Sequence, residues 1–184
     1  MTKKKPVKIF MIHQFLMSEL EAHLAKRLQS YSQRLFVDMS CPIEMKIPID
    51  KLEYIQEIAC GRMMESDLVI VLPDMPAERE VEDMASDSIS GLGDTFTSAR
   101  GLHHNSTYAT EIRTLMFDSC DSKPALVLGW TKESAEYLAD KLRHPKGIGH
   151  RPYDSTRFHA MGLDDASGKH DIAKKILSIL DAHS

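Results

Sequence analysis

The chain has 184 residues, of which 42% are hydrophobic and 27% are charged. This length and composition suit a single globular domain with a sizeable core, and they exclude an intrinsically disordered chain. The formal net charge of −4 gives no reason to expect direct binding to nucleic acid or to an anionic membrane surface.

The cellular compartment is predicted from what the sequence lacks. Residues 1–10 contain no apolar stretch long enough for a signal peptide, and no apolar run approaches the ~20 residues of a membrane span. The three cysteines are odd in number and widely spaced, without a C-x-x-C pair, which favours reduced thiols. We therefore expect a cytoplasmic protein.

Short apolar segments recur along the chain and predict strands. The third and fourth are apolar throughout, which is typical of central parallel strands that are buried on both faces. In chain order, the predicted strands lie at residues 7–12, 35–37, 68–72, 125–130 and 157–161.

Between these strands, apolar residues recur at helical spacing. In the first such segment Leu20, Leu24 and Leu28 are four residues apart with charged residues between them, which predicts an amphipathic helix with a narrow apolar stripe. The predicted helices lie at residues 16–31, 52–63, 106–120, 132–143 and 171–180.

Alternating strands and helices predict a parallel sheet with helices on both faces. Right-handed crossovers then give a single-domain, doubly wound, flavodoxin-like α/β fold with about five strands in the order 2-1-3-4-5. We find no internal repeat and no linker that would divide the chain into two domains. Residues 74–105 form a long insertion between the third strand and the next helix, either a lid over a site or a segment for partner contacts.

In a doubly wound sheet, the ligand binds beyond the carboxyl ends of the strands, near the switch between the first and third strands. Residues that follow these strands, or that begin the helix after the third strand, should therefore meet at one rim. The candidate site residues at this rim are His13, Gln14, Phe15, Asp38, Ser40, His104, Tyr108 and Glu111.

Glu111 is the candidate catalytic residue. Ser106 or Thr107 can cap the helix that carries it. The helix dipole favours a negative charge in the first turns, so we expect Glu111 to be ionised at neutral pH. A carboxylate at this rim can hold sugar hydroxyls or stabilise a developing positive charge. The simplest alternative is an ordinary solvated first-turn glutamate.

Several reaction classes lack their sequence signatures. No glycine-rich phosphate or dinucleotide loop follows the first strand, and no G-x-S-x-G elbow occurs. His103 and His104 are adjacent rather than four residues apart, so we predict no metal site. One carboxylate without a metal or a strong base suits cleavage of an N-glycosidic bond, whose transition state has oxocarbenium character.

Five blocks of the sequence resemble those of TIR-like domains, and most closely the TIR-like group found in bacterial anti-phage defence systems. The blocks are KIFMIH at 8–13, LFVD at 35–38, SDLVIVL at 66–72, ATEI at 109–112 and KPALVL at 123–128. The resemblance implies a TIR-like fold and a role in immune signalling.

The same resemblance implies an activity. TIR-like enzymes of this kind release nicotinamide from NAD and then hydrolyse, cyclise or transfer the ADP-ribosyl group, so NAD is the substrate and no cofactor is implied. Such domains commonly complete their site through self-association. Glu111 matches the family's catalytic glutamate, and His13, Gln14, Phe15 and Asp38 would lie near the bound nucleotide.

Two other interpretations stay open. Residues 106–112, STYATEI, resemble the G-T-x-x-E block of nucleoside 2-deoxyribosyltransferases, which also cut an N-glycosidic bond with a glutamate. The chain has Thr107 where the TIR-like family usually has Trp. The second alternative is a non-enzymatic TIR-like signalling module, in which residues 74–105 dock another protein.

Overall fold

The computed structural model describes residues 5–13, 18–38, 52–73, 111–116, 120, 122–144, 154–168 and 170–183. The predicted insertion at residues 74–105 lies outside these ranges, so both interpretations of it stay predictions. Within the described ranges, no helix is both long and apolar enough to cross a membrane.

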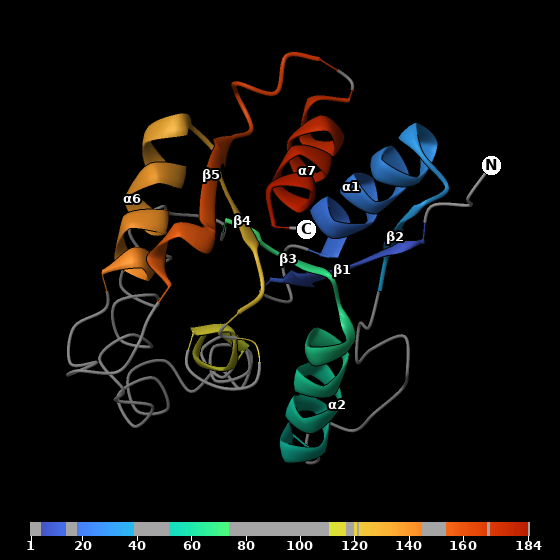
Figure 1. The fold of residues 1–184 in the computed structure, drawn as a ribbon, viewed down its shortest axis with the longest axis vertical. Coiled ribbons are helices and arrows are strands. Elements are labelled where there is room, and N and C mark those ends of the chain that lie inside the picture. Colours follow the sequence, from blue (N-terminus) through green and yellow to red (C-terminus); the bar gives the residue numbers. More distant parts are fainter. Residues whose placement is uncertain are drawn as a thin grey trace.

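Five parallel strands form one sheet in the order β2-β1-β3-β4-β5 (Figure 1). Because every neighbouring pair is parallel, the connections must cross over the sheet. The predicted fold class and strand order are confirmed. The strands are β1 (Val7–Ile12), β2 (Leu35–Val37), β3 (Leu68–Val71), β4 (Ala125–Gly129) and β5 (Phe158–Gly162).

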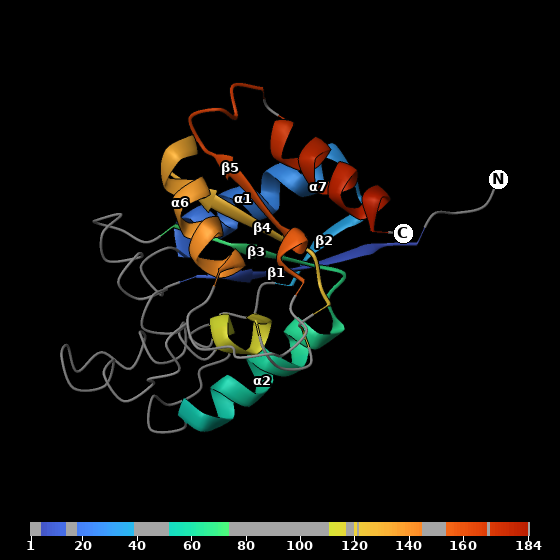
Figure 2. The ribbon, with the colours of Figure 1, turned by 60° about the vertical axis from the view of Figure 1, so that its left-hand side comes forward.

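Helices cover both faces of this sheet (Figure 2). The first and last described helices pack on one face, and the other two pack on the opposite face together with a helical segment at residues 111–116. The bounds are α1 (Ser18–Tyr31), α2 (Leu52–Glu65), α6 (Lys132–Arg143) and α7 (Asp171–Ala182), with a 3-10 helix, η3 (Ser155–Arg157), before β5.

Alternation of side chains along the strands divides the core into two layers. In β1, Phe10 and Ile12 pack with α2, whereas Ile9 and Met11 pack with α1. β3 and β4 are buried along their whole length. This burial is what their uninterrupted apolar sequences predict, and it explains why the centre of the sheet could be recognised without a structure.

The central strands β1 and β3 end at the same level of the sheet. Ile12 is in register with Val71, whereas the shorter β2 ends where Val37 pairs with Ile9. His13, the residue after β1, therefore leaves the sheet at the middle of its carboxyl edge. This is the switch point at which a doubly wound sheet binds its ligand.

The fifth strand begins later than predicted, because Arg157 belongs to η3. Asp154 caps this short helix by accepting a hydrogen bond from the Thr156 N–H (2.9 Å). The turn sends the Arg157 side chain into the core, where it is fully buried. A charged side chain with that role cannot be recognised from an apolar pattern.

The fourth strand ends at Gly129, one residue before the predicted end. The chain turns there into a capping box at the start of α6. The Thr131 hydroxyl accepts from the Ser134 N–H (3.1 Å), and the Ser134 hydroxyl accepts from the Thr131 N–H (3.1 Å). The box fixes where α6 begins and brings its first turn against the end of β4.

This close packing requires glycine at position 129, because a Cβ there would overlap the backbone of Ala135. We expect Gly129→Ala to lower the free energy of unfolding by about 2 kcal/mol.

Within the described part of the chain, Gly61, inside α2, has no atom from outside its own helix within 4 Å of the same added carbon. Gly61→Ala should therefore raise stability by about 0.5–1 kcal/mol through helix propensity. Urea unfolding measures both variants, and effects of the same sign would contradict this assignment.

Candidate active site

His13 and Glu21 lie in contact at the carboxyl edge of β1 and form an ion pair when the imidazole is protonated. His13 Nε2 lies 2.9 Å from Glu21 Oε2, and only 13% of the histidine side chain and 2% of the glutamate side chain are exposed. Charges that are shielded from water interact more strongly than charges on the surface. The candidate His13 thus has an acidic partner that comes from α1.

Sequence reasoning misses Glu21 as a site residue. The helical pattern assigns the charged residues between the leucines to the solvent face. In the structure, Glu21 shares a buried face of α1 with Leu24, Ala25 and Leu28. Its separation of three, four and seven residues from these positions is the spacing of one helix face, and this is the signal that could have identified it.

Glu111 is also buried, with 7% of the residue exposed. It opens the described helical segment 111–116, which lies beside α2 on the same face of the sheet (Figure 2). Three fully buried side chains of this segment pack in the core: Ile112, Leu115 and Met116. The segment is therefore held firmly to the sheet, and Glu111 is not the solvated first-turn residue of the simplest alternative.

Burial raises the pKa of Glu111 from 4.5 to about 8, while the charge of His13 lowers it and that of Glu21 raises it. The prediction that Glu111 is ionised at neutral pH is therefore wrong. Burial has a larger effect on the pKa than the helix dipole, because the free-energy cost of desolvating a carboxylate exceeds the stabilisation that the dipole gives it. A pKa of about 8 favours the protonated Glu111 carboxyl at neutral pH.

Glu111 thus responds to the charges of His13 and Glu21, which lie on two other elements. We call His13, Glu21 and Glu111 the His–Glu cluster. Both other members are close enough to act on the charge of Glu111. A buried carboxyl with a raised pKa can give up its proton to accommodate a cationic group or to stabilise a positive transition state. The cluster is the strongest candidate for chemistry in the described part of the chain.

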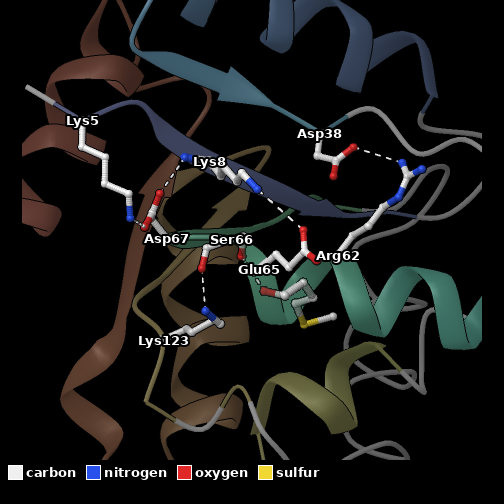
Figure 3. A network of polar contacts seen from close by, with 9 residues as sticks. Lys5, Lys8, Asp38, Arg62, Glu65, Ser66, Asp67 and Lys123 are labelled. Carbon is white, nitrogen blue, oxygen red and sulfur yellow. Dashed lines mark hydrogen bonds and ion pairs between the residues drawn. The ribbon is translucent and has the colours of Figure 1, made fainter.

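Asp38, another predicted site residue, lies at the end of β2 and pairs with α2. Its Oδ1 lies 3.0 Å from Arg62 Nη1, and about a third of each side chain is exposed. Figure 3 shows the carboxylate of Asp38 turned towards this guanidinium. Asp38 is not among the groups that act on the charge of Glu111, so the structure does not bring it into the His–Glu cluster.

The other polar contacts in Figure 3 lie near the amino ends of β1 and β3. Asp67 Oδ2 accepts from the Lys8 N–H (2.8 Å), and Lys123 Nζ donates to the Ser66 carbonyl (2.5 Å). These bonds tie the entries of the strands together at the edge of the sheet opposite to His13. They support the fold and do not contribute to the candidate site.

The remaining predicted site residues lie outside the described part of the chain, so their roles stay predictions. They are Gln14, Phe15, Ser40, His104 and Tyr108. Among the described residues, no three His, Cys, Asp or Glu side chains are arranged to hold a metal ion.

The chain matches no protein-family model, no curated protein and no solved structure. A functional assignment therefore depends on the fold, on the His–Glu cluster and on the sequence blocks described above.

Proposed function

We propose that the protein is a TIR-like enzyme that cleaves the nicotinamide N-glycosidic bond of NAD. The observation that carries this proposal is the burial of Glu111 with His13 and Glu21. The strand order agrees with a TIR-like domain. The resemblance of five sequence blocks to domains of anti-phage systems supports a role in bacterial immune signalling, with self-association completing the site.

In the proposed reaction, the bond between ribose C1′ and the nicotinamide nitrogen breaks. The bonding electron pair goes to the ring nitrogen, so neutral nicotinamide leaves and positive charge develops on the ribose. The ionised Glu111 carboxylate stabilises that charge. Attack on C1′ by water then gives ADP-ribose and a proton. Attack by a nucleophile within the same ADP-ribosyl group or on another molecule gives cyclisation or transfer.

The charge of the substrate matters for this carboxyl. The nicotinamide ring of NAD is a cation, and a cation next to a buried carboxyl favours its ionised form. Binding of NAD should therefore release the Glu111 proton and prepare the carboxylate for the bond-breaking step. A nucleoside carries no such charge, so its binding would leave the Glu111 proton in place.

A nucleoside 2-deoxyribosyltransferase-like activity is the second candidate, since the STYATEI block at 106–112 favours it. It uses the same residue and breaks the same type of bond. The two candidates differ in substrate and in acceptor, because the transferase moves a deoxyribosyl group from one base to another. Free nicotinamide from NAD and base exchange on deoxynucleosides therefore distinguish them.

We expect the purified protein to release nicotinamide from NAD, and Glu111→Gln to reduce the rate at least about 100-fold. The matched control is Glu57→Gln, which changes an exposed glutamate on α2 and should leave the rate unchanged. Chromatography of the products measures the rate. A rate per protein molecule that rises with protein concentration would indicate that self-association completes the site.

Equal rates for wild type and Glu111→Gln would overturn the role of Glu111. Base exchange on deoxynucleosides without NAD consumption would favour the second candidate. A protein that turns over neither substrate at any concentration would support the non-enzymatic signalling module.

A further inference from the structure

We propose that Glu21 is a positioning residue that holds His13 as an imidazolium at the carboxyl edge of β1, so that a fixed positive charge stands beside Glu111. This inference deepens the proposed function and depends on it for the role of Glu111. It assigns a task to a buried glutamate of α1 that the helical pattern of charged residues assigns to the solvent face.

The geometry of the pair is that of a fixed charge and not of a surface contact. Glu21 Oε2 lies 2.9 Å from His13 Nε2, and 2% of the glutamate side chain is exposed. A buried carboxylate needs a cationic or hydrogen-bonding partner, because its transfer out of water is costly. Within the described residues Glu21 Oε2 accepts no hydrogen bond, so His13 Nε2 is its partner through charge at close range, and the protonated ring is the form that a carboxylate favours.

Stability alone does not explain a glutamate at this position. The same face of α1 carries Leu24, Ala25 and Leu28, all buried against the sheet. A buried ion pair is often no more stable than well-packed apolar residues of similar volume. An apolar side chain would therefore serve the fold as well as Glu21. Buried charges gathered beside a carboxyl of perturbed pKa are typical of functional sites.

The two members of the pair act on Glu111 in opposite directions. His13 lowers the pKa of Glu111 and Glu21 raises it, and the influence of His13 is the larger of the two. If Glu21 keeps the ring charged, loss of Glu21 removes both influences at once. The pKa of Glu111 should then rise above its value in the wild type. Loss of His13 alone should raise it further, because the repulsion by Glu21 remains.

The direct test is nitrogen-15 NMR of the histidine rings in wild type, Glu21→Gln and Glu57→Gln, with His13→Gln used to assign the His13 signal. We expect the wild-type His13 ring to be doubly protonated at pH 7. In Glu21→Gln its titration midpoint should move to lower pH by at least about one unit. Glu57→Gln, an exposed change on α2, should leave the His13 signal in place.

A neutral His13 ring in the wild type at pH 7 would overturn the proposal, and this measurement does not require any Glu21 variant to fold. An unchanged His13 midpoint in folded Glu21→Gln would overturn it as well. Glu21→Asp retains the carboxylate, so it should recover part of the shift. A purely structural Glu21 would show no such recovery of the ring's protonated state.

Turnover gives a second readout. If the ionised Glu111 is the active form, kcat/KM of the wild type for NAD should rise as the pH passes through about 8. In Glu21→Gln this rise should move to higher pH, whereas a downward move would contradict the proposal. Should the protein not process NAD at all, the NMR titrations still decide the role of Glu21. Failure of the proposed function and failure of this inference are therefore distinguishable.

Discussion

At pH 9, Glu111→Gln should be more stable than the wild type by on the order of 4 kcal/mol. Burial raises the pKa of Glu111 in the folded protein from 4.5 to about 8, and each pKa unit corresponds to ~1.4 kcal/mol. Above pH 8 the wild type must keep a buried carboxylate in the fold. Glutamine has nearly the same shape and is never charged, so the variant avoids this cost.

The sign of the pH dependence follows from proton binding. Between pH 4.5 and about 8 the folded wild type holds a proton on Glu111 that the unfolded chain has lost. The free energy of unfolding therefore falls as the pH rises through this window, and it levels off above it. The stabilising contribution of the protonated carboxyl is fully present below pH 4.5. The difference between variant and wild type should accordingly grow from pH 5 to pH 9.

Urea unfolding at pH 5, 7 and 9 measures this difference, with Glu57→Gln as the control for an exposed glutamate. Any cost of fitting the amide group is independent of pH, so the change with pH is the decisive quantity. A difference that stays constant across the three pH values would show that Glu111 keeps an ordinary pKa. Together with the expected loss of turnover, the result would mark Glu111 as a residue at which stability is sacrificed for activity.

The second large effect concerns Arg157, whose replacement by methionine should destabilise the protein by about 3–5 kcal/mol. Its guanidinium is fully buried and stacks on Phe158, with 4.3 Å between the guanidinium carbon and the ring centroid. It donates to four main-chain carbonyls: Leu115 (2.7 Å), Met116 (3.4 Å), Cys120 (3.0 Å) and Lys123 (3.0 Å). Without the guanidinium, these carbonyls lose a donor in the core.

Arg143→Met is the matched control for this experiment. Arg143 also bonds a main-chain carbonyl, that of Phe158, through Nε (3.0 Å) and Nη2 (2.8 Å). The Arg143 side chain is partly exposed, so in the variant water can bond the carbonyl in its place. The free energy of unfolding should therefore fall by only about 1 kcal/mol. Arg157→Lys should not restore the stability, because one ammonium group cannot replace the several N–H donors of the planar guanidinium. Equal melting temperatures for the Arg157 and Arg143 variants would contradict the assigned role of Arg157.

The sheet could be predicted from the sequence because burial on both faces leaves a direct trace in it. The uninterrupted apolar runs of β3 and β4 identify the centre, and right-handed crossovers then leave one simple strand order. His13 could be placed at the carboxyl edge for the same reason. The place of His13 directly after the first strand is enough to locate it, without any knowledge of side-chain packing.

The rest of the site depends on contacts between distant segments. The position of Glu111 in the first turn suggests an ionised carboxylate, because the helix dipole depends only on neighbouring residues. Its burial depends on packing against distant segments, which the sequence pattern does not show. Glu21 looks like a solvent-facing residue among the charged residues of α1, and only its spacing from Leu24, Ala25 and Leu28 indicates the buried face. Arg157 appears as the start of a strand because nothing in residues 157–161 reveals that carbonyls near residue 120 need a donor.

The bonds of Arg157 also bear on how the length of this chain can vary. They fasten the segment that carries Glu111 at its carboxyl end, through the carbonyls of Leu115 and Met116. The described part of the chain that follows Glu111 thus helps to set the position of the glutamate. Closing a loop twice as long costs only ~0.6 kcal/mol more. We therefore expect insertions or deletions within residues 74–103 to leave the carboxyl in its place on the sheet.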